Sequence, residues 1–219
     1  MNNKVIEMKN VCFAYDNQEE VLHDVSCTIY QQEFVILVGE NGAGKSTLLN
    51  LLLSKLKKKH GQIYLFDDAI AENDHYQDIA YISQNSVSNY RSFPTTIEEV
   101  VRMHLRHLKK EVDIQHYLKI VKLEQHANKM LKELSGGQLQ RVAILLALLK
   151  DAKLIILDEP TTGVDKNYSQ ELFSLLKDLT KMDKTILMVT HHIAEVKPYI
   201  DRILLLVDGM CTETNKENA

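Results

Sequence analysis

Residues 39–46 have the types and spacing of a loop that binds phosphate. The run reads Gly39-Glu40-Asn41-Gly42-Ala43-Gly44-Lys45-Ser46 and matches the pattern G-x-x-x-x-G-K-[ST]. In such a loop, backbone N–H groups curl around phosphate oxygens, and the helix that follows directs its positive N-terminal end at the same anion. Lys45 supplies a positive charge for the β- and γ-phosphates, and Ser46 supplies a hydroxyl for Mg²⁺. An apolar run, FVILV, precedes the loop, so we predict a nucleotide site between a strand and a helix.

Two carboxylates follow a second apolar run. Residues 154–157 read LIIL, and Asp158 and Glu159 come directly after them. A buried strand of this kind delivers side chains to the carboxyl edge of a parallel sheet, where ligands bind. One carboxylate can hold Mg²⁺, and the next can orient or deprotonate a water molecule. Together with the loop, this pair predicts a P-loop nucleoside triphosphatase.

The elements that must position these residues alternate along the chain, which favours an α/β fold with a parallel sheet. We expect strands over residues 4–15, 21–30, 34–38, 63–66, 79–83, 154–157, 185–189 and 202–207. We expect helices over residues 46–56, 95–108, 112–123, 125–132, 138–149 and 168–181, with a further short helix before the last strand. Thr95 and Glu98 have capping-box spacing after Pro94, which predicts the start of the second helix.

This pattern predicts a single domain over residues 1–219. Its parallel core carries an antiparallel β region at the N-terminus and a helical insertion at about residues 85–150. Residues 210–219 are polar and are expected to be a loosely attached tail.

Composition excludes several other classes of protein. The chain has 219 residues and a formal net charge of −4, which argues against a nucleic-acid binder, since those normally present a basic face. The three cysteines are scattered and form no CxxC pair, which favours reduced thiols in a cytosolic protein. The longest apolar stretch, residues 142–149, is far shorter than the ~20 residues that cross a bilayer.

A third motif, at residues 134–138, indicates which kind of P-loop nucleoside triphosphatase this is. Leu134-Ser135-Gly136-Gly137-Gln138 precedes a predicted helix, so a hydroxyl and backbone amides are presented to an anion at the N-terminus of that helix. The motif resembles the signature of ATP-binding cassette (ABC) proteins. Four further positions are similar to motifs of that family: Gln84 to the Q-loop glutamine, Asp165 to the D-loop, His191 to the switch histidine, and Tyr15 to the aromatic residue that stacks on adenine.

The resemblance implies the ABC nucleotide-binding fold, with ATP and Mg²⁺ as ligands. It implies catalytic roles for Glu159, His191, Gln84 and Lys45, and it implies that Mg²⁺ is held by Ser46, Gln84 and Asp158. The residues that it assigns to ATP contact are Tyr15, Gly39, Glu40, Asn41, Gly42, Ala43, Gly44, Lys45, Ser46, Thr47, Ser135, Gly136, Gly137, Gln138 and Asp165. Because the family sandwiches ATP between two copies, the resemblance also implies a homodimer.

A run that starts at Phe93-Pro94, FPTTIEEVV, resembles the ATPases of zinc and manganese importers. This resemblance implies an ATP-hydrolysing subunit of a divalent-metal importer, for zinc first and manganese second. Its partners would be an integral-membrane permease and a metal-binding lipoprotein, with the chain held in the cytoplasm at the inner face of the cell membrane. Phe93 is interpreted as an exposed docking residue, with core packing as the alternative. His104 and His107 are interpreted as a solvated helix face and not as a metal site.

Two alternatives to metal import stay open at this point. One is a soluble ABC ATPase without a transport role, such as an iron–sulfur assembly type, and the other is an ABC ATPase for a different cargo. A GTPase is disfavoured, because Asn128-Lys129 is followed by Met-Leu and not by the rest of a base-reading N-K-x-D motif.

Overall fold

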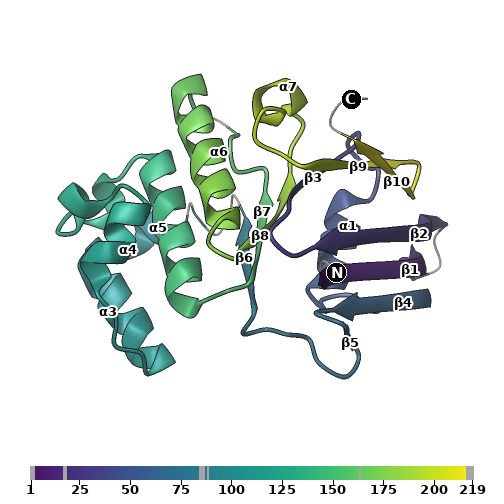
Figure 1. The fold of residues 1–219 in the computed structure, drawn as a ribbon, viewed down its shortest axis with the longest axis horizontal. Coiled ribbons are helices and arrows are strands. Elements are labelled where there is room, and N and C mark those ends of the chain that lie inside the picture. The colour runs from purple at the N-terminus through teal and green to yellow at the C-terminus, as the bar shows by residue number, and fades with distance from the viewer. Residues whose placement is uncertain (1–2, 17–18, 84–86, 88, 163, 216–219) are drawn as a thin grey trace.

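The computed structural model describes residues 3–16, 19–83, 87, 89–162 and 164–215, and the strands within them form two sheets. The smaller sheet is antiparallel, has the order β2-β1-β4-β5, and lies at one end of the molecule (Figure 1). Its strands are β1 (Lys4–Ala14), β2 (Glu20–Tyr30), β4 (His60–Leu65) and β5 (Asp68–Ala69). This is the N-terminal antiparallel region that the sequence predicted.

The larger sheet has the order β10-β9-β3-β8-β7-β6 and is parallel except at β10. Successive residues of β3 belong to two different hydrophobic clusters. Phe34 and Ile36 pack in one cluster, and Val35 and Leu37 pack in the other. Burial on both faces explains why FVILV has no polar position. The strands are β3 (Phe34–Val38), β6 (Ile79–Ser83), β7 (Leu154–Asp158), β8 (Thr185–Val189), β9 (Arg202–Val207) and β10 (Met210–Asn215).

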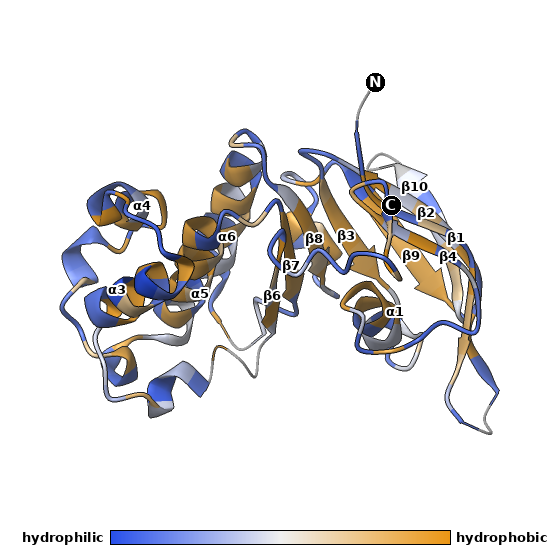
Figure 2. Cartoon of the chain, turned by 90° about the horizontal axis from the view of Figure 1, so that it is seen from below, coloured by the Kyte–Doolittle hydropathy of each residue, from blue (hydrophilic) through white to orange (hydrophobic). Residues whose placement is uncertain are grey.

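Helices cover both faces of the larger sheet. Helix α1 (Lys45–Leu52) lies between the two sheets, where its leucines share a cluster with β1 and β3 (Figure 2). Helices α5 (Gly136–Lys150), α6 (Lys166–Thr180) and α7 (Ile193–Val196) contribute to the cluster on the opposite face. Helix α5 is buried nearly all round because α3 (Ile97–Leu108) and α4 (Ile114–Ile120) cover its outer side, which explains its almost unbroken apolar sequence.

The helical insertion contains α3 (Ile97–Leu108) and α4 (Ile114–Ile120), both shorter than predicted. The capping box of α3 is also one residue later than predicted. Thr96 Oγ1 accepts the Glu99 N–H at 3.2 Å, and the Glu99 carboxylate accepts the Thr96 N–H at 2.8 Å. A tertiary contact explains the later start of the helix. The N–H of Leu131 donates to the carbonyl oxygen of Thr95 at 2.9 Å, so Thr95 does not serve as the N-cap.

The prediction of a helix over residues 125–132 is wrong. This segment contains only the 3₁₀ turn Glu124–His126, and another, Leu131–Glu133, begins at its end. Between the turns the backbone pairs with the start of α3: the N–H groups of Ile97 and Glu98 donate to the carbonyl oxygens of Lys129 and Ala127. These bonds hold the segment as a series of turns against α3 and override its helical composition.

The prediction of a loose tail after Gly209 is wrong for residues 210–215. They form β10, which pairs with β9 in continuous antiparallel register from Met210 to Asn215. Glu213 fixes the strand further, since its carboxylate accepts the N–H of Thr28 at 3.1 Å and pairs with Arg202 at 3.0 Å. Polar side chains suit this edge strand because its outer face meets water.

None of the helices in the described ranges is long and apolar enough to cross a bilayer.

Candidate functional site

The loop between β3 and α1 is shaped by its glycines and closed by a lysine. Gly42 and Gly44 have φ values of +89° and +101°, a left-handed backbone that glycine adopts without strain. At Gly39, a Cβ would overlap the carbonyl oxygen of Leu206 on β9. Lys45 Nζ donates to two carbonyl oxygens of the loop, including that of Gly39 at 2.7 Å. The loop therefore holds an ammonium group beside its exposed backbone amides.

Helix α1 begins at this loop without a side-chain cap. Gly44 is the N-cap residue, and the first turn contains no acidic side chain. The first N–H groups of a helix have no partner within the helix, and they carry its positive dipole end. The loop and the start of α1 together form a site for an anion such as a phosphate chain.

A cleft of about 430 Å³ lies beside the loop and brings together segments that are far apart in the sequence. It is lined by the loop and the first turn of α1, by Tyr15 after β1, and by Asp158 and Glu159 at the end of β7. The side chain of Tyr15 is 41% exposed, and its hydroxyl lies 3.2 Å from Thr47 Oγ1. An exposed aromatic ring at the edge of an anion site is suited to stacking on a nucleotide base.

Asp158 faces the loop from β7 and is held by a tyrosine of the neighbouring strand. The hydroxyl of Tyr81 on β6 donates to Asp158 Oδ2 at 3.0 Å. Burial, with the negative charge of Asp158, raises the pKa of Tyr81 far above its usual value, so the phenol stays a donor. The bond leaves the second oxygen of Asp158 for another partner, such as a cation.

Glu159 and His191 form a pair at the carboxyl ends of two adjacent strands, β7 and β8. His191 Nδ1 lies 3.0 Å from Glu159 Oε2, within the distance of an ion pair, and that buried oxygen has no hydrogen-bond partner in the described part of the chain. The backbone of Glu159 has φ +49°, a conformation that costs a residue with a side chain roughly 1–2 kcal/mol. Its N–H donates to the carbonyl oxygen of Val189 at 3.0 Å, which holds the turn in place. A carboxylate on a strained backbone, partly exposed beside an anion site, is suited to act as a general base.

The signature residues lie elsewhere. Ser135 is the N-cap of α5, and it forms a capping box with Gln138 through bonds of 3.2 and 3.0 Å. Gly136 has open space where a Cβ would be, and Asp165 is the N-cap of α6, where its side chain accepts the N–H of Tyr168. Ser135, Gly136, Gly137, Gln138 and Asp165 are all absent from the lining of the cleft.

The structure thus divides the predicted site residues into two groups. Tyr15, the loop, Asp158, Glu159 and His191 gather around the cleft, and the signature residues and Asp165 form a second group. Gln84 lies outside the described residues. Sequence reasoning missed Tyr81, because its contact with Asp158 depends on β6 lying next to β7, an order that no local pattern reveals.

A second cleft, of about 490 Å³, lies between β6, α3 and α5. Tyr76 lines it and is 73% exposed, and Phe93, close in sequence to the lining residue Tyr90, is 56% exposed. The alternative that Phe93 packs in the core is therefore wrong. His104 also lines the cleft, half-buried, with Nε2 3.1 Å from the carbonyl oxygen of Leu146, and burial lowers its pKa. Within the described ranges, no three His, Cys, Asp or Glu side chains are arranged to hold a metal ion.

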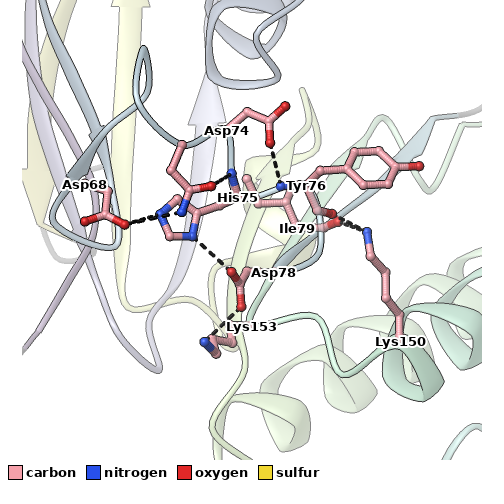
Figure 3. Close-up of polar contacts among 9 residues, drawn as sticks. Asp68, Asp74, His75, Tyr76, Asp78, Ile79, Lys150 and Lys153 are labelled. Atoms are coloured by element: carbon pink, nitrogen blue, oxygen red, sulfur yellow. Dashed lines mark hydrogen bonds and ion pairs between the residues drawn. The ribbon is translucent and has the colours of Figure 1, made fainter. Parts of the chain in front are cut away.

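The connection between β5 and β6 contributes Asp74 and Tyr76 to this second cleft, and a histidine between them makes two polar contacts (Figure 3). The side chain of His75 is 9% exposed and lies between two carboxylates, with Nδ1 2.9 Å from Asp78 and Nε2 3.0 Å from Asp68. Lys150 of α5 donates to the carbonyl oxygen of Tyr76 at 2.5 Å. These contacts tie the connection between β5 and β6 to β5 through Asp68 and to α5 through Lys150.

Known proteins resemble the chain over nearly its whole length. The family described as ABC transporter matches residues 22–162. The zinc uptake system ATP-binding protein ZurA of Listeria monocytogenes is 36% identical, over 96% of this chain and 87% of its own length. The zinc transport system ATP-binding protein TroB of Treponema pallidum is 35% identical, over 92% of this chain and 77% of its own length.

Solved structures share the fold. The chain cbiO1 of Clostridium perfringens, part of the ABC transporter complex cbiONQ, superposes with a TM-score of 0.88 at 25% identity, covering 99% of this chain and 90% of that one. A nucleotide-free ATP-binding cassette from an ABC transporter gives a TM-score of 0.82 at 25% identity, covering 97% and 91%. With its family match, its relatives and its two-sheet fold in agreement, this chain belongs to the ABC transporter family and is one of its ATPase subunits.

Proposed function

We propose that this chain hydrolyses ATP to drive the import of zinc through a separate membrane subunit. The observation that carries the ATPase part is the Glu159–His191 pair beside the phosphate-binding loop. The zinc part is supported by the names of the relatives ZurA and TroB. The relatives reported above serve transport, which supports a transporter subunit over an iron–sulfur assembly ATPase.

The residues around the cleft fit ATP and Mg²⁺. The loop amides and Lys45 suit the β- and γ-phosphates, and Tyr15 suits the adenine ring. The Ser46 hydroxyl and the Asp158 carboxylate are hard oxygen donors of the kind that Mg²⁺ prefers, and Gln84 is proposed to join them. Bound there, Mg²⁺ would neutralise phosphate charge.

Glu159 is proposed as the general base. A water oxygen attacks the γ-phosphorus, the bond from that phosphorus to the β–γ bridging oxygen breaks, and ADP and phosphate result. Glu159 takes a proton from the attacking water, and His191 holds the carboxylate in position at 3.0 Å.

The second group of site residues is proposed to act across a dimer. Ser135 and Gly136 are exposed at the N-terminus of α5 and make no contribution to the cleft of their own chain. A second copy would bring Ser135, Gly136, Gly137, Gln138 and Asp165 to the phosphates of the first, completing two identical sites.

The second cleft is proposed as the docking site of the membrane subunit, with Phe93 as an aromatic anchor. Together with a permease and a metal-binding lipoprotein, the complex would hold this chain at the cytoplasmic face of the cell membrane. Manganese is the second choice of cargo.

The test is uptake of radioactive zinc by cells that lack the gene and have no other zinc importer. We expect uptake to be lost, to return with the wild-type gene, and to stay low with Phe93→Ala, although the purified Phe93→Ala chain binds ATP normally. Met182→Ala is the matched control, since Met182 is exposed and lies outside both clefts. Normal zinc and manganese uptake in the deleted strain would contradict the metal assignment and leave the ATPase assignment in place.

A further inference from the structure

Tyr168 joins the two helix N-termini that carry the second group of site residues. It lies in the first turn of α6, and its backbone N–H donates to Asp165 Oδ1 at 2.9 Å. Its hydroxyl donates to the carbonyl oxygen of Gly137, in the first turn of α5, also at 2.9 Å. One side chain therefore connects the cap of α6 to the signature motif.

The ring of Tyr168 also explains why the signature has a residue without a side chain at position 137. A Cβ built on Gly137 would overlap three carbon atoms of the Tyr168 ring, whereas a Cβ on Gly136 would meet nothing within 4 Å. Gly137 is buried and Gly136 is exposed. The inner glycine thus lets the tyrosine ring approach the backbone, and the outer one leaves its face open toward solvent.

A buried arginine holds the ring from α5. The guanidinium of Arg141 lies 5.7 Å from the centre of the Tyr168 ring, and it pairs with Glu171 of α6 at 2.5 Å. Arg141 also donates to the carbonyl oxygen of Val121, just after α4, at 3.1 Å. Burial raises the pKa of Tyr168, so its hydroxyl stays a hydrogen-bond donor across the range of ordinary pH.

We propose that Tyr168 is a positioning residue that fixes the first turn of α5 relative to Asp165, so that both reach the ATP bound by a second copy together. This inference rests on the proposed ATP sandwich and adds a residue that the ABC motifs in the sequence do not include. Since Tyr168 does not line the cleft of its own chain, it acts on the closure of the dimer and not on the first binding of ATP.

The test removes the hydroxyl alone. Tyr168→Phe keeps the ring beneath Gly137 and deletes one neutral hydrogen bond, which is worth about fivefold in an equilibrium constant. In the Glu159→Gln background, which retains ATP, we expect the dissociation constant of the ATP-bound dimer to rise by up to that factor, because the first turn of α5 must then be ordered when the dimer closes. We expect the affinity of the single chain for ATP to be unchanged. Amide exchange of Gly137 and Gln138 in the nucleotide-free chain should become faster.

Tyr64→Phe is the matched control, because it deletes a tyrosine hydroxyl in the distant antiparallel sheet. It should change neither dimerisation nor exchange at the signature. A Glu159→Gln chain that fails to dimerise with ATP would overturn the proposed sandwich. If the Glu159→Gln chain dimerises and adding Tyr168→Phe leaves its dissociation constant unchanged, only the role of Tyr168 is overturned.

A double-mutant cycle tests the ring. Gly137→Ala should destabilise the wild-type fold strongly, because its Cβ meets the ring, and it should cost much less in the Tyr168→Ala background, where the space is open. The melting temperatures of the four nucleotide-free chains give this comparison without any need for activity. Equal losses in both backgrounds would show that the ring does not constrain Gly137, and the proposal would fall.

Discussion

Glu159 combines three properties in one side chain: a left-handed backbone, a buried carboxylate oxygen and a histidine at 3.0 Å. A carboxylate that served only stability would be expected to pair with a lysine or arginine. Here the surrounding strands hold it in a costly conformation beside the phosphate-binding loop, as expected of a residue that reacts with a positioned water.

Glu159→Gln separates chemistry from binding. The amide keeps the shape of the side chain but cannot take a proton, so we expect the rate of ATP hydrolysis to fall by about 10²–10⁴-fold, with ATP still bound. The retained ATP should hold two chains together, which size-exclusion chromatography at saturating ATP would detect. Normal hydrolysis by this variant would show that Glu159 is not the base.

The residues around the cleft were predictable from the sequence because each belongs to a short run with its own chemical logic. The glycines, Lys45 and Ser46 follow one another in a single loop, and Glu159 follows a buried strand directly. Tyr81 and Tyr168 were not predictable, because each acts on a residue from a distant segment, Asp158 and Gly137. Such contacts exist only once the strands and helices are in place.

At the scale of elements, burial on two faces made β3, β7, β8 and α5 easy to predict, since their apolar runs have no other explanation. Boundaries failed where tertiary bonds replaced local ones. Residues 127–131 pair with the start of α3, and residues 210–215 pair with β9. In both cases the composition of the segment does not predict its conformation, because hydrogen bonds to the partner strand or helix determine it.

The connection between β5 and β6 gives a pH prediction. Burial alone would raise the pKa of Asp78, but bonds from Lys153 at 2.8 Å and from His75 at 2.9 Å outweigh it and lower the pKa below its ordinary value of 3.8. Asp78 binds a proton more readily in the unfolded chain than in the folded one. Its contribution to stability is therefore complete above about pH 4 and is lost as the pH falls through its lowered folded pKa.

Asp78→Asn removes this dependence. We expect the variant to be less stable than wild type at neutral pH, and we expect the difference to shrink between about pH 4 and pH 2. Urea unfolding at a series of pH values measures both chains, with Asp208→Asn as a control, since Asp208 is exposed and outside this network. A difference that stayed constant down to pH 2 would contradict the role given to the ion pairs.

At the scale of the whole molecule, the two groups of site residues call for a second copy. Lys45→Ala should remove most of the affinity for ATP, because it deletes a charge-assisted contact to phosphate. Ser135→Arg should leave that affinity in place and block closure of the dimer by its bulk. Each variant alone should be inactive.

A mixture of these two chains tests the sandwich directly. In the mixed dimer one site carries both defects, whereas the other combines a normal loop with a normal signature. Some ATPase activity should therefore return on mixing, and activity assays on purified mixed dimers would measure it. The control is a mixed dimer in which both chains carry Lys45→Ala and differ only in their tags, because neither of its sites has a normal loop. No recovery in verified mixed dimers would argue against independent composite sites.

The strand order of the larger sheet also has a consequence for how the protein is made. Strand β3 carries the phosphate-binding loop, yet its neighbours are β8 and β9, which are synthesised after all the other strands of this sheet except β10. The antiparallel sheet can form early, because β1, β2, β4 and β5 all come from the first third of the chain. While translation continues, however, β3 has two unpaired edges that invite pairing with other chains. The nascent polypeptide therefore gains its nucleotide site only after residues 202–207 have left the ribosome, and an interrupted translation product is an aggregation hazard and not a weaker ATPase.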